Sequence, residues 1–177
     1  GASAVLDALT RGREHALVFF DPNARPSIMG EPAVALVSLE RFIALADVVK
    51  VSDEDIEWLT GGAPIDKVVD RWLRLGPSLV VVTRGKHGSD VATASGVRFT
   101  KTPSDVKVVD TVGAGDSFMG GMIDAMWGMG LRGADAREAL RSLPEEQVRA
   151  IIDRASAVSD VTVSRKGANP PWAHELP

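Results

Sequence analysis

The sequence contains no cysteine, which excludes disulfide bonds and thiolate-ligated metal sites. No apolar run approaches the length of a membrane-spanning helix, and residues 1–4 lack the basic and apolar regions of a signal peptide. A basic excess is also absent, because the net charge is −4 and Lys and Arg are scattered along the chain. We therefore expect a cytoplasmic protein that binds neither nucleic acid nor a membrane.

The composition is typical of a soluble globular protein. The chain has 177 residues, of which 45% are hydrophobic and 25% charged, enough for one domain over residues 1–177 with a single core. Strand and helix signals alternate along it. Strands are predicted over 16–20, 46–51, 79–83 and 106–109, a hairpin over 91–99, and helices over 32–45, 53–59, 65–75, 118–129, 134–143 and 144–158. This alternation predicts an α/β fold with an open, mainly parallel sheet, in which ligands bind beyond the carboxyl ends of the strands.

Several local details of these elements can also be predicted. Ser52 is expected to cap the helix that starts at Asp53, and Pro144 to be the first residue of its helix. The pair Gly120-Gly121 lowers helix propensity, so we expect close backbone packing to compensate there. Met122, Met126 and Met129 recur at helical spacing and are interpreted as core residues.

The run Asp110-Thr111-Val112-Gly113-Ala114-Gly115-Asp116 joins the predicted strand 106–109 to the helix 118–129. A Gly-Ala-Gly turn at such a junction leaves backbone N–H groups unpaired, and together with the helix dipole these form a cradle for phosphate. Asp116 lies beside that cradle, where a phosphate would repel it, which indicates chemistry more than simple binding. A Gly-x-Gly-Asp sequence taken alone is also compatible with a tight turn and an acidic cap.

The seven-residue run resembles the C-terminal signature of the ribokinase-like (pfkB) carbohydrate kinases. Four further segments resemble other parts of the family pattern, in the same order, and point to its fructokinase and 2-keto-3-deoxygluconate kinase branch: Asp21–Pro26, Lys50–Asp55, Thr83–Ser89 and the tail that begins with Ser164–Ala168. The resemblance implies a three-layer α/β/α fold. It covers about the C-terminal half to three-fifths of the pattern and lacks the N-terminal strands and the β lid.

The resemblance implies ATP-dependent phosphorylation of a hydroxyl group on fructose or a related keto-sugar. In this family the residue at Asp116 is the general base, and the amides of Gly113, Ala114 and Gly115 form an anion hole for the transferring phosphoryl group. Nucleotide binding is implied for Thr83, Gly85, Gly88, Thr111, Ser164 and Gly167, with adenine contacts assigned weakly to Lys86, Ala155, Ala157 and Ser159. Asn23 and Arg25 are implied on the substrate and phosphate side, although they are also compatible with a turn and a surface position.

The expected cofactors are ATP, Mg²⁺ and a monovalent cation such as K⁺. Many family members have the pattern N-x-x-E where this chain has Ser52 and Asp55. Asp55 is the implied metal residue because it keeps the negative charge. Its side chain is one methylene shorter than Glu, a difference that the retained waters of Mg²⁺ could absorb.

Two alternatives to a sugar kinase stay open. One is a kinase for a nucleoside or another small alcohol, and the other is a non-catalytic nucleotide-binding fragment that acts through association. The presence of Asp116 favours catalysis, since a binding remnant has no need of a base. Gly1 is not preceded by Met, so we expect a piece or processed product of a longer chain, which forms a homodimer or associates with the N-terminal portion.

Overall fold

The computed structural model describes residues 2–176, and its contacts divide them into two compact units. Unit 1 consists of the residues up to Lys101 together with Arg132–Ser142. Unit 2 consists of Thr102–Leu131 together with the residues from Leu143 onward. Gly1, on which the expectation of a longer chain was based, lies outside the described residues. None of the described helices is both long enough and apolar enough to cross a membrane.

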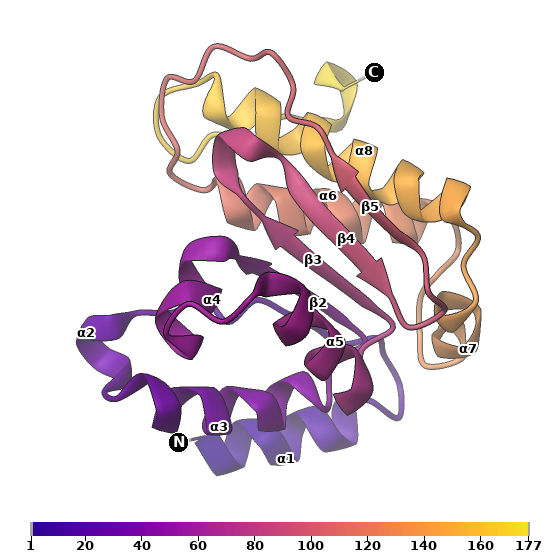
Figure 1. The fold of residues 1–177 in the computed structure, drawn as a ribbon. Helices are drawn as coiled ribbons and strands as arrows, with labels where there is room; N and C mark the ends of the chain where they lie inside the picture. The colour runs from indigo at the N-terminus through magenta and orange to yellow at the C-terminus, as the bar shows by residue number, and fades with distance from the viewer. Residues whose placement is uncertain (1, 177) are drawn as a thin grey trace. The chain divides into compact units, whose positions relative to one another are not determined.

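Unit 1 contains a five-stranded sheet in the order β1-β2-β3-β4-β5 (Figure 1). The strands are β1 (Phe19–Phe20), β2 (Val48–Ser52), β3 (Leu79–Thr83), β4 (Ser89–Thr93) and β5 (Arg98–Lys101). The first three strands are parallel to one another, whereas β4 and β5 continue the sheet as an antiparallel hairpin. The predicted α/β class is confirmed, with a mixed sheet whose antiparallel part is the predicted hairpin.

The helices of unit 1 pack on one another and on the sheet (Figure 1). They are α1 (Ala2–Gly12), α2 (Pro26–Met29), α3 (Pro32–Ile43), α4 (Asp53–Thr60), α5 (Ile65–Leu75) and α7 (Ala136–Arg141), with a 3₁₀ turn η1 (Gly85–His87). Helix α4 begins where it was predicted, because the Ser52 hydroxyl accepts a hydrogen bond from the Asp55 amide at 3.0 Å. Helix α5 has the predicted bounds.

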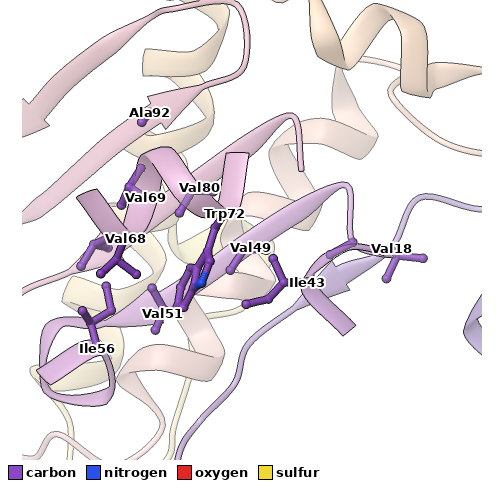
Figure 2. Packing of buried hydrophobic residues seen from close by; sticks show 12 residues of the cluster. Val18, Ile43, Val49, Val51, Ile56, Val68, Val69, Trp72, Val80 and Ala92 are labelled. Carbon is purple, nitrogen blue, oxygen red and sulfur yellow. The ribbon is translucent and has the colours of Figure 1, made fainter. Parts of the chain in front are cut away.

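The core of unit 1 is centred on Trp72 of α5, whose side chain is fully buried. Figure 2 shows it among residues of both central strands, including Val49 and Val51 of β2 and Val80 of β3. Alternate residues of a strand point to the same face, so Val49 and Val51 both meet the helices. The ring nitrogen of Trp72 donates to Glu40 at 3.2 Å, which satisfies its one polar group.

Helix α7 is held to unit 1 by a buried carboxylate. Asp47 is 1% exposed, and it accepts from the Val18 amide at 2.8 Å and from Arg137 Nε at 2.6 Å. Arg13 adds a longer contact of 3.3 Å. This carboxylate raises the pKa of Arg137, chiefly through the hydrogen bond between the two side chains. A charge that is removed from water in this way must be paired, so the network fixes α7 against the start of β2.

Unit 2 is built on two long helices, α6 (Ala114–Gly128) and α8 (Glu145–Val163), which lie side by side (Figure 1). A short 3₁₀ turn, η2 (Ala173–Glu175), follows near the end of the chain. A Cβ atom on Gly121 would lie 2.7 Å from the Ala155 Cα, so the expected close packing is confirmed at this glycine. Gly120 faces open space instead. Met122 and Met126 are fully buried, whereas Met129 is 39% exposed.

Some sequence-based boundaries were wrong. Residues 106–109 form no strand among the described residues. The amides of Val109 and Asp110 instead both donate to the Val163 carbonyl, at 2.7 and 3.2 Å, so this extended segment caps the end of α8. Pro144 is the residue before α8, not its first residue. Strand β1 is reduced to two residues, and helices α1 and α2 were not predicted.

Candidate functional site

The Gly-Ala-Gly turn of unit 2 lies at the N-terminus of α6. Gly113 is the N-cap residue with φ 79° and ψ 2°, in the left-handed region. A Cβ atom at this position would lie 3.0 Å from the Cβ of Ala168. Gly113 is therefore required both by its backbone conformation and by the close approach of the C-terminal loop.

Three backbone amides at this helix start are available for a ligand. In the described part of the chain, the N–H groups of Gly113, Gly115 and Asp116 have no hydrogen-bond acceptor. The Ala114 amide differs, since it donates to the Thr111 carbonyl at 3.2 Å. Unpaired N–H groups at the positive end of a helix dipole attract anions. The turn is therefore suited to attract an anion, whereas the Ala114 amide is engaged within the turn itself.

Asp116 lies directly beside these amides, as the third residue of α6. Its side chain is exposed, and among residues 2–176 it forms no hydrogen bond or ion pair. A carboxylate in this state can accept a proton from a bound hydroxyl group without first breaking an internal contact. Within the described residues, an unpaired carboxylate and unpaired amides thus lie on a single turn of backbone.

Asp110 holds this turn to the C-terminal loop. One of its oxygens accepts from the Val112 amide at 3.0 Å, and the other accepts from the Gly167 amide at 2.9 Å. These two hydrogen bonds, with Val112 as the larger cause, lower the pKa of Asp110. The bond to Val112 is an Asx-turn, which the sequence could have suggested, but the bond to Gly167 joins residues far apart in the chain.

The C-terminal loop carries two of the predicted nucleotide-binding residues. Ser164 caps the end of α8, where its hydroxyl donates to the Val161 carbonyl at 2.8 Å. Gly167 has φ 72° and is drawn to the motif by Asp110. Farther along, Glu175 pairs with Arg165 and accepts from the Trp172 amide at 2.7 Å. Hydrogen bonding from the Arg165 side chain is the main cause of the lowered pKa of Glu175. The loop is therefore closed on itself by several contacts.

Two of the α8 residues that were weakly assigned to adenine contacts, Ala155 and Ser159, pack on or bond to helix α6. Ala155 is fully buried where Gly121 of α6 approaches it. The Ser159 hydroxyl donates to the Ala114 carbonyl at 3.2 Å, which ties α8 to the first turn of α6. Ala157 is half-buried on the same helix. Lys86, by contrast, lies exposed in unit 1.

In unit 1, the predicted residue Thr83 is the last residue of β3, and Gly85 and Gly88 belong to the tight turn that follows it. The Arg84 amide donates to the Gly88 carbonyl at 2.8 Å, and the Gly88 amide donates to the Gly85 carbonyl at 3.1 Å. Both glycines have positive φ, 50° and 86°, which favours glycine at each position. The Thr83 hydroxyl donates to the Val51 carbonyl at 3.3 Å, so it also links β3 to β2.

A second predicted group in unit 1 lies after β1 and at the start of α4. Arg25 donates to the Asn23 side chain at 2.6 Å, and the Ala24 amide donates to Asp55 at 3.1 Å. The structure thus brings Asn23, Arg25 and Asp55 together around Ala24. Within residues 2–176, no cluster of three or more His, Asp or Glu side chains is placed to hold a metal ion. A lone carboxylate such as Asp55 suits Mg²⁺ that keeps most of its waters.

Comparison with known proteins gives consistent similarities. Residues 2–175 match the family model described as pfkB family carbohydrate kinase. A fructokinase from Rhizobium leguminosarum bv. trifolii is 36% identical over 124 residues, covering 70% of this chain and 36% of the relative. This chain therefore spans well under two thirds of the length of that relative.

Two solved structures show the same partial coverage. The crystal structure of fructokinase with bound ATP from Xylella fastidiosa is 28% identical with a TM-score of 0.81, covering 94% of this chain and 52% of that one. The structure of aminoimidazole riboside kinase from Salmonella enterica, complexed with aminoimidazole riboside and an ATP analogue, is 28% identical with a TM-score of 0.74. The match covers 93% of this chain and 52% of that kinase.

Proposed function

The chain belongs to the pfkB family of carbohydrate kinases, and on that premise we propose that it carries out ATP-dependent phosphorylation of a sugar hydroxyl group. Fructose or a related keto-sugar, including 2-keto-3-deoxygluconate, is the proposed acceptor. The fructokinase similarity supports this choice.

The proposed chemistry uses the first turn of α6. Asp116 takes the proton from the acceptor hydroxyl, whose oxygen forms a new bond to the γ-phosphorus of ATP. The bond between that phosphorus and the bridging oxygen of the β-phosphate breaks, and ADP leaves. Charge on the transferring group falls on its non-bridging oxygens. The amides of Gly113 and Gly115 would donate to those oxygens, as an anion hole does.

One observation carries this proposal: unpaired amides and an unpaired carboxylate occupy the same backbone turn. A tight turn with an acidic cap would direct the Asp116 side chain back to the helix amides. Within the described residues, no such bond is formed by Asp116. The acid is therefore not needed to cap α6, which supports a role for it in proton transfer.

The other predicted residues are assigned supporting roles in the same proposal. Mg²⁺, supported by Asp55, would neutralise charge on the nucleotide phosphates when bound, and a monovalent cation such as K⁺ is proposed near the motif. Arg25 and Asn23 are assigned to the substrate and phosphate side. The nucleotide is assigned to Thr83, Gly85 and Gly88 in unit 1, and to Thr111, Ser164 and Gly167 in unit 2.

A riboside is the second candidate acceptor. The structural similarity to aminoimidazole riboside kinase favours it, because that similarity is comparable to the one with a fructokinase. A role in nucleotide binding without catalysis is the third candidate.

The deciding experiment follows ADP release from Mg-ATP with fructose, 2-keto-3-deoxygluconate and aminoimidazole riboside in turn, alongside calorimetry with ATP alone. We expect ADP release with one of the keto-sugars. ADP release only with the riboside would identify a riboside, and not a keto-sugar, as the acceptor. ATP binding without ADP release on any acceptor would support the binding role. Absence of both turnover and ATP binding would contradict the proposal.

A further inference from the structure

The turn formed by Asp21–Arg25 after β1 has an unusual backbone. Asn23 has φ 43°, and it is the one residue other than glycine with positive φ in the described part of the chain. Such a conformation persists only where neighbouring groups hold it. The Arg25 guanidinium folds back onto the turn, donating to the Asn23 carbonyl at 3.2 Å and to the Ala24 carbonyl at 3.0 Å. The direction of Arg25 is thus coupled to the shape of this turn.

Two carboxylates fix the turn to the rest of unit 1. Asp21 accepts from the Asn23 amide at 3.3 Å with one oxygen and pairs with the buried Lys50 of β2 at 2.9 Å with the other. Asp55 accepts from the Ala24 amide at 3.1 Å. Ala24 is only 6% exposed, so without Asp55 its N–H would be left buried and unpaired, which is unfavourable.

Asp55 is itself held in place by the start of α4. Its amide donates to the Ser52 hydroxyl, so the side chain leaves a capped helix turn at a fixed point. Within the described residues, the neighbouring Asp53 makes no such contact with the turn, and its carboxylate accepts from the Glu54 amide at 3.1 Å. The two acids therefore have similar charge and helix position but different targets.

We propose that Asp55 is a positioning residue, which acts through the Ala24 amide to hold the Asn23–Arg25 turn in its substrate-facing shape. This inference rests on the proposed function, because that function assigns Asn23 and Arg25 to the substrate and phosphate side. Positioning requires only a hydrogen-bond acceptor at residue 55. Support of Mg²⁺ requires its negative charge. The two roles are therefore separable by substitution.

The first test measures hydrogen exchange of the Ala24 amide by NMR in the 177-residue chain. We expect Asp55→Ala to speed exchange at Ala24 about tenfold, the equivalent of losing one hydrogen bond. Asp55→Asn keeps an acceptor oxygen, so it should change the exchange rate at Ala24 by less than about threefold. Asp53→Ala is the matched control and should leave Ala24 unchanged. Unchanged exchange in Asp55→Ala, or equal acceleration in Asp53→Ala, would overturn the proposal.

The second test is kinetic. We expect Asp55→Ala to lower kcat about tenfold with a smaller change in the KM for ATP, and Asp55→Asn to recover most of that loss at saturating Mg²⁺. In an Arg25→Ala background, Asp55→Ala should lower kcat by less than about twofold, because the effects of coupled residues are not additive. A full tenfold loss in both backgrounds would refute positioning of Arg25. If the unchanged chain shows no turnover, the proposed function fails, while Ala24 exchange still decides the inference.

Discussion

Gly121 provides the most direct test of the packing that supports the motif helix. Replacing it with alanine would place a Cβ 2.7 Å from the Ala155 Cα, 3.1 Å from Val158 Cγ2 and 3.2 Å from the Ala155 amide nitrogen. Two of these atoms belong to the α8 backbone, so relief requires the helices to separate. Overpacking of this kind costs about 1–3 kcal/mol. The better helix propensity of alanine offsets about 1 kcal/mol of that.

The neighbouring glycine supplies the control. An alanine Cβ at Gly120 would meet nothing within 4 Å, so Gly120→Ala should gain stability by about 0.5–1 kcal/mol. The propensity gain is common to both variants. The difference between them therefore measures the cost of the contact with α8, which we expect to be about 1–3 kcal/mol.

Urea unfolding followed by far-UV circular dichroism measures both free energies. We expect the transition midpoint to rise for Gly120→Ala and to fall for Gly121→Ala, with similar slopes. If both variants gain the same stability, the close approach of α6 and α8 at Gly121 is refuted. A changed slope for Gly121→Ala alone would indicate an altered compactness of one state, and not the contact described here.

Three further predictions concern other features. Gly113→Ala places a side chain at positive φ and against Ala168. We therefore expect a stability loss of about 1–2 kcal/mol in urea unfolding, together with a lower kcat. Unchanged stability and turnover would contradict this prediction. Asp47→Ala should destabilise the chain by about 3 kcal/mol in thermal or urea unfolding, because it leaves the charges of the paired arginines without a partner. A stability loss under about 1 kcal/mol would contradict the network. The lowered pKa of Asp110 means that its stabilisation is complete above the unfolded pKa and is lost as the pH falls below about 4. Urea midpoints measured between pH 7 and pH 3 should therefore fall less steeply in Asp110→Asn than in the unchanged chain, and identical slopes would refute the linkage.

The sequence predicted those elements whose signals are local. The amphipathic pattern of residues 65–75 and the apolar run 79–83 gave the bounds of α5 and β3. Ser52 was identified as a cap because capping involves residues three apart. Helix α1 was overlooked, although Leu6 and Leu9 have helical spacing. In the structure, Leu6 is its buried residue.

The remaining features depend on contacts between distant residues. The run at 106–109 has the composition of a strand. The amides of Val109 and of the following Asp110 instead bond to the end of α8, a contact that no local pattern indicates. The partners of Asp110 and Asp55 lie 57 and 31 residues away in the chain. The motif at 110–116 therefore indicated the phosphate cradle and Asp116. The contacts that hold the turns in place could be identified only from the structure.

The central claim is that Asp116 is the base of a phosphoryl transfer. The most direct measurement compares the kcat for ADP release and the Kd for ATP in Asp116→Asn and in the unchanged chain. Asp124→Asn serves as the control, because Asp124 is an exposed acid on the same helix that pairs with Arg154 at 2.8 Å. We predict that Asp116→Asn removes most of kcat and leaves the Kd for ATP nearly unchanged, with Asp124→Asn close to normal in both. Near-normal turnover by Asp116→Asn would contradict the account.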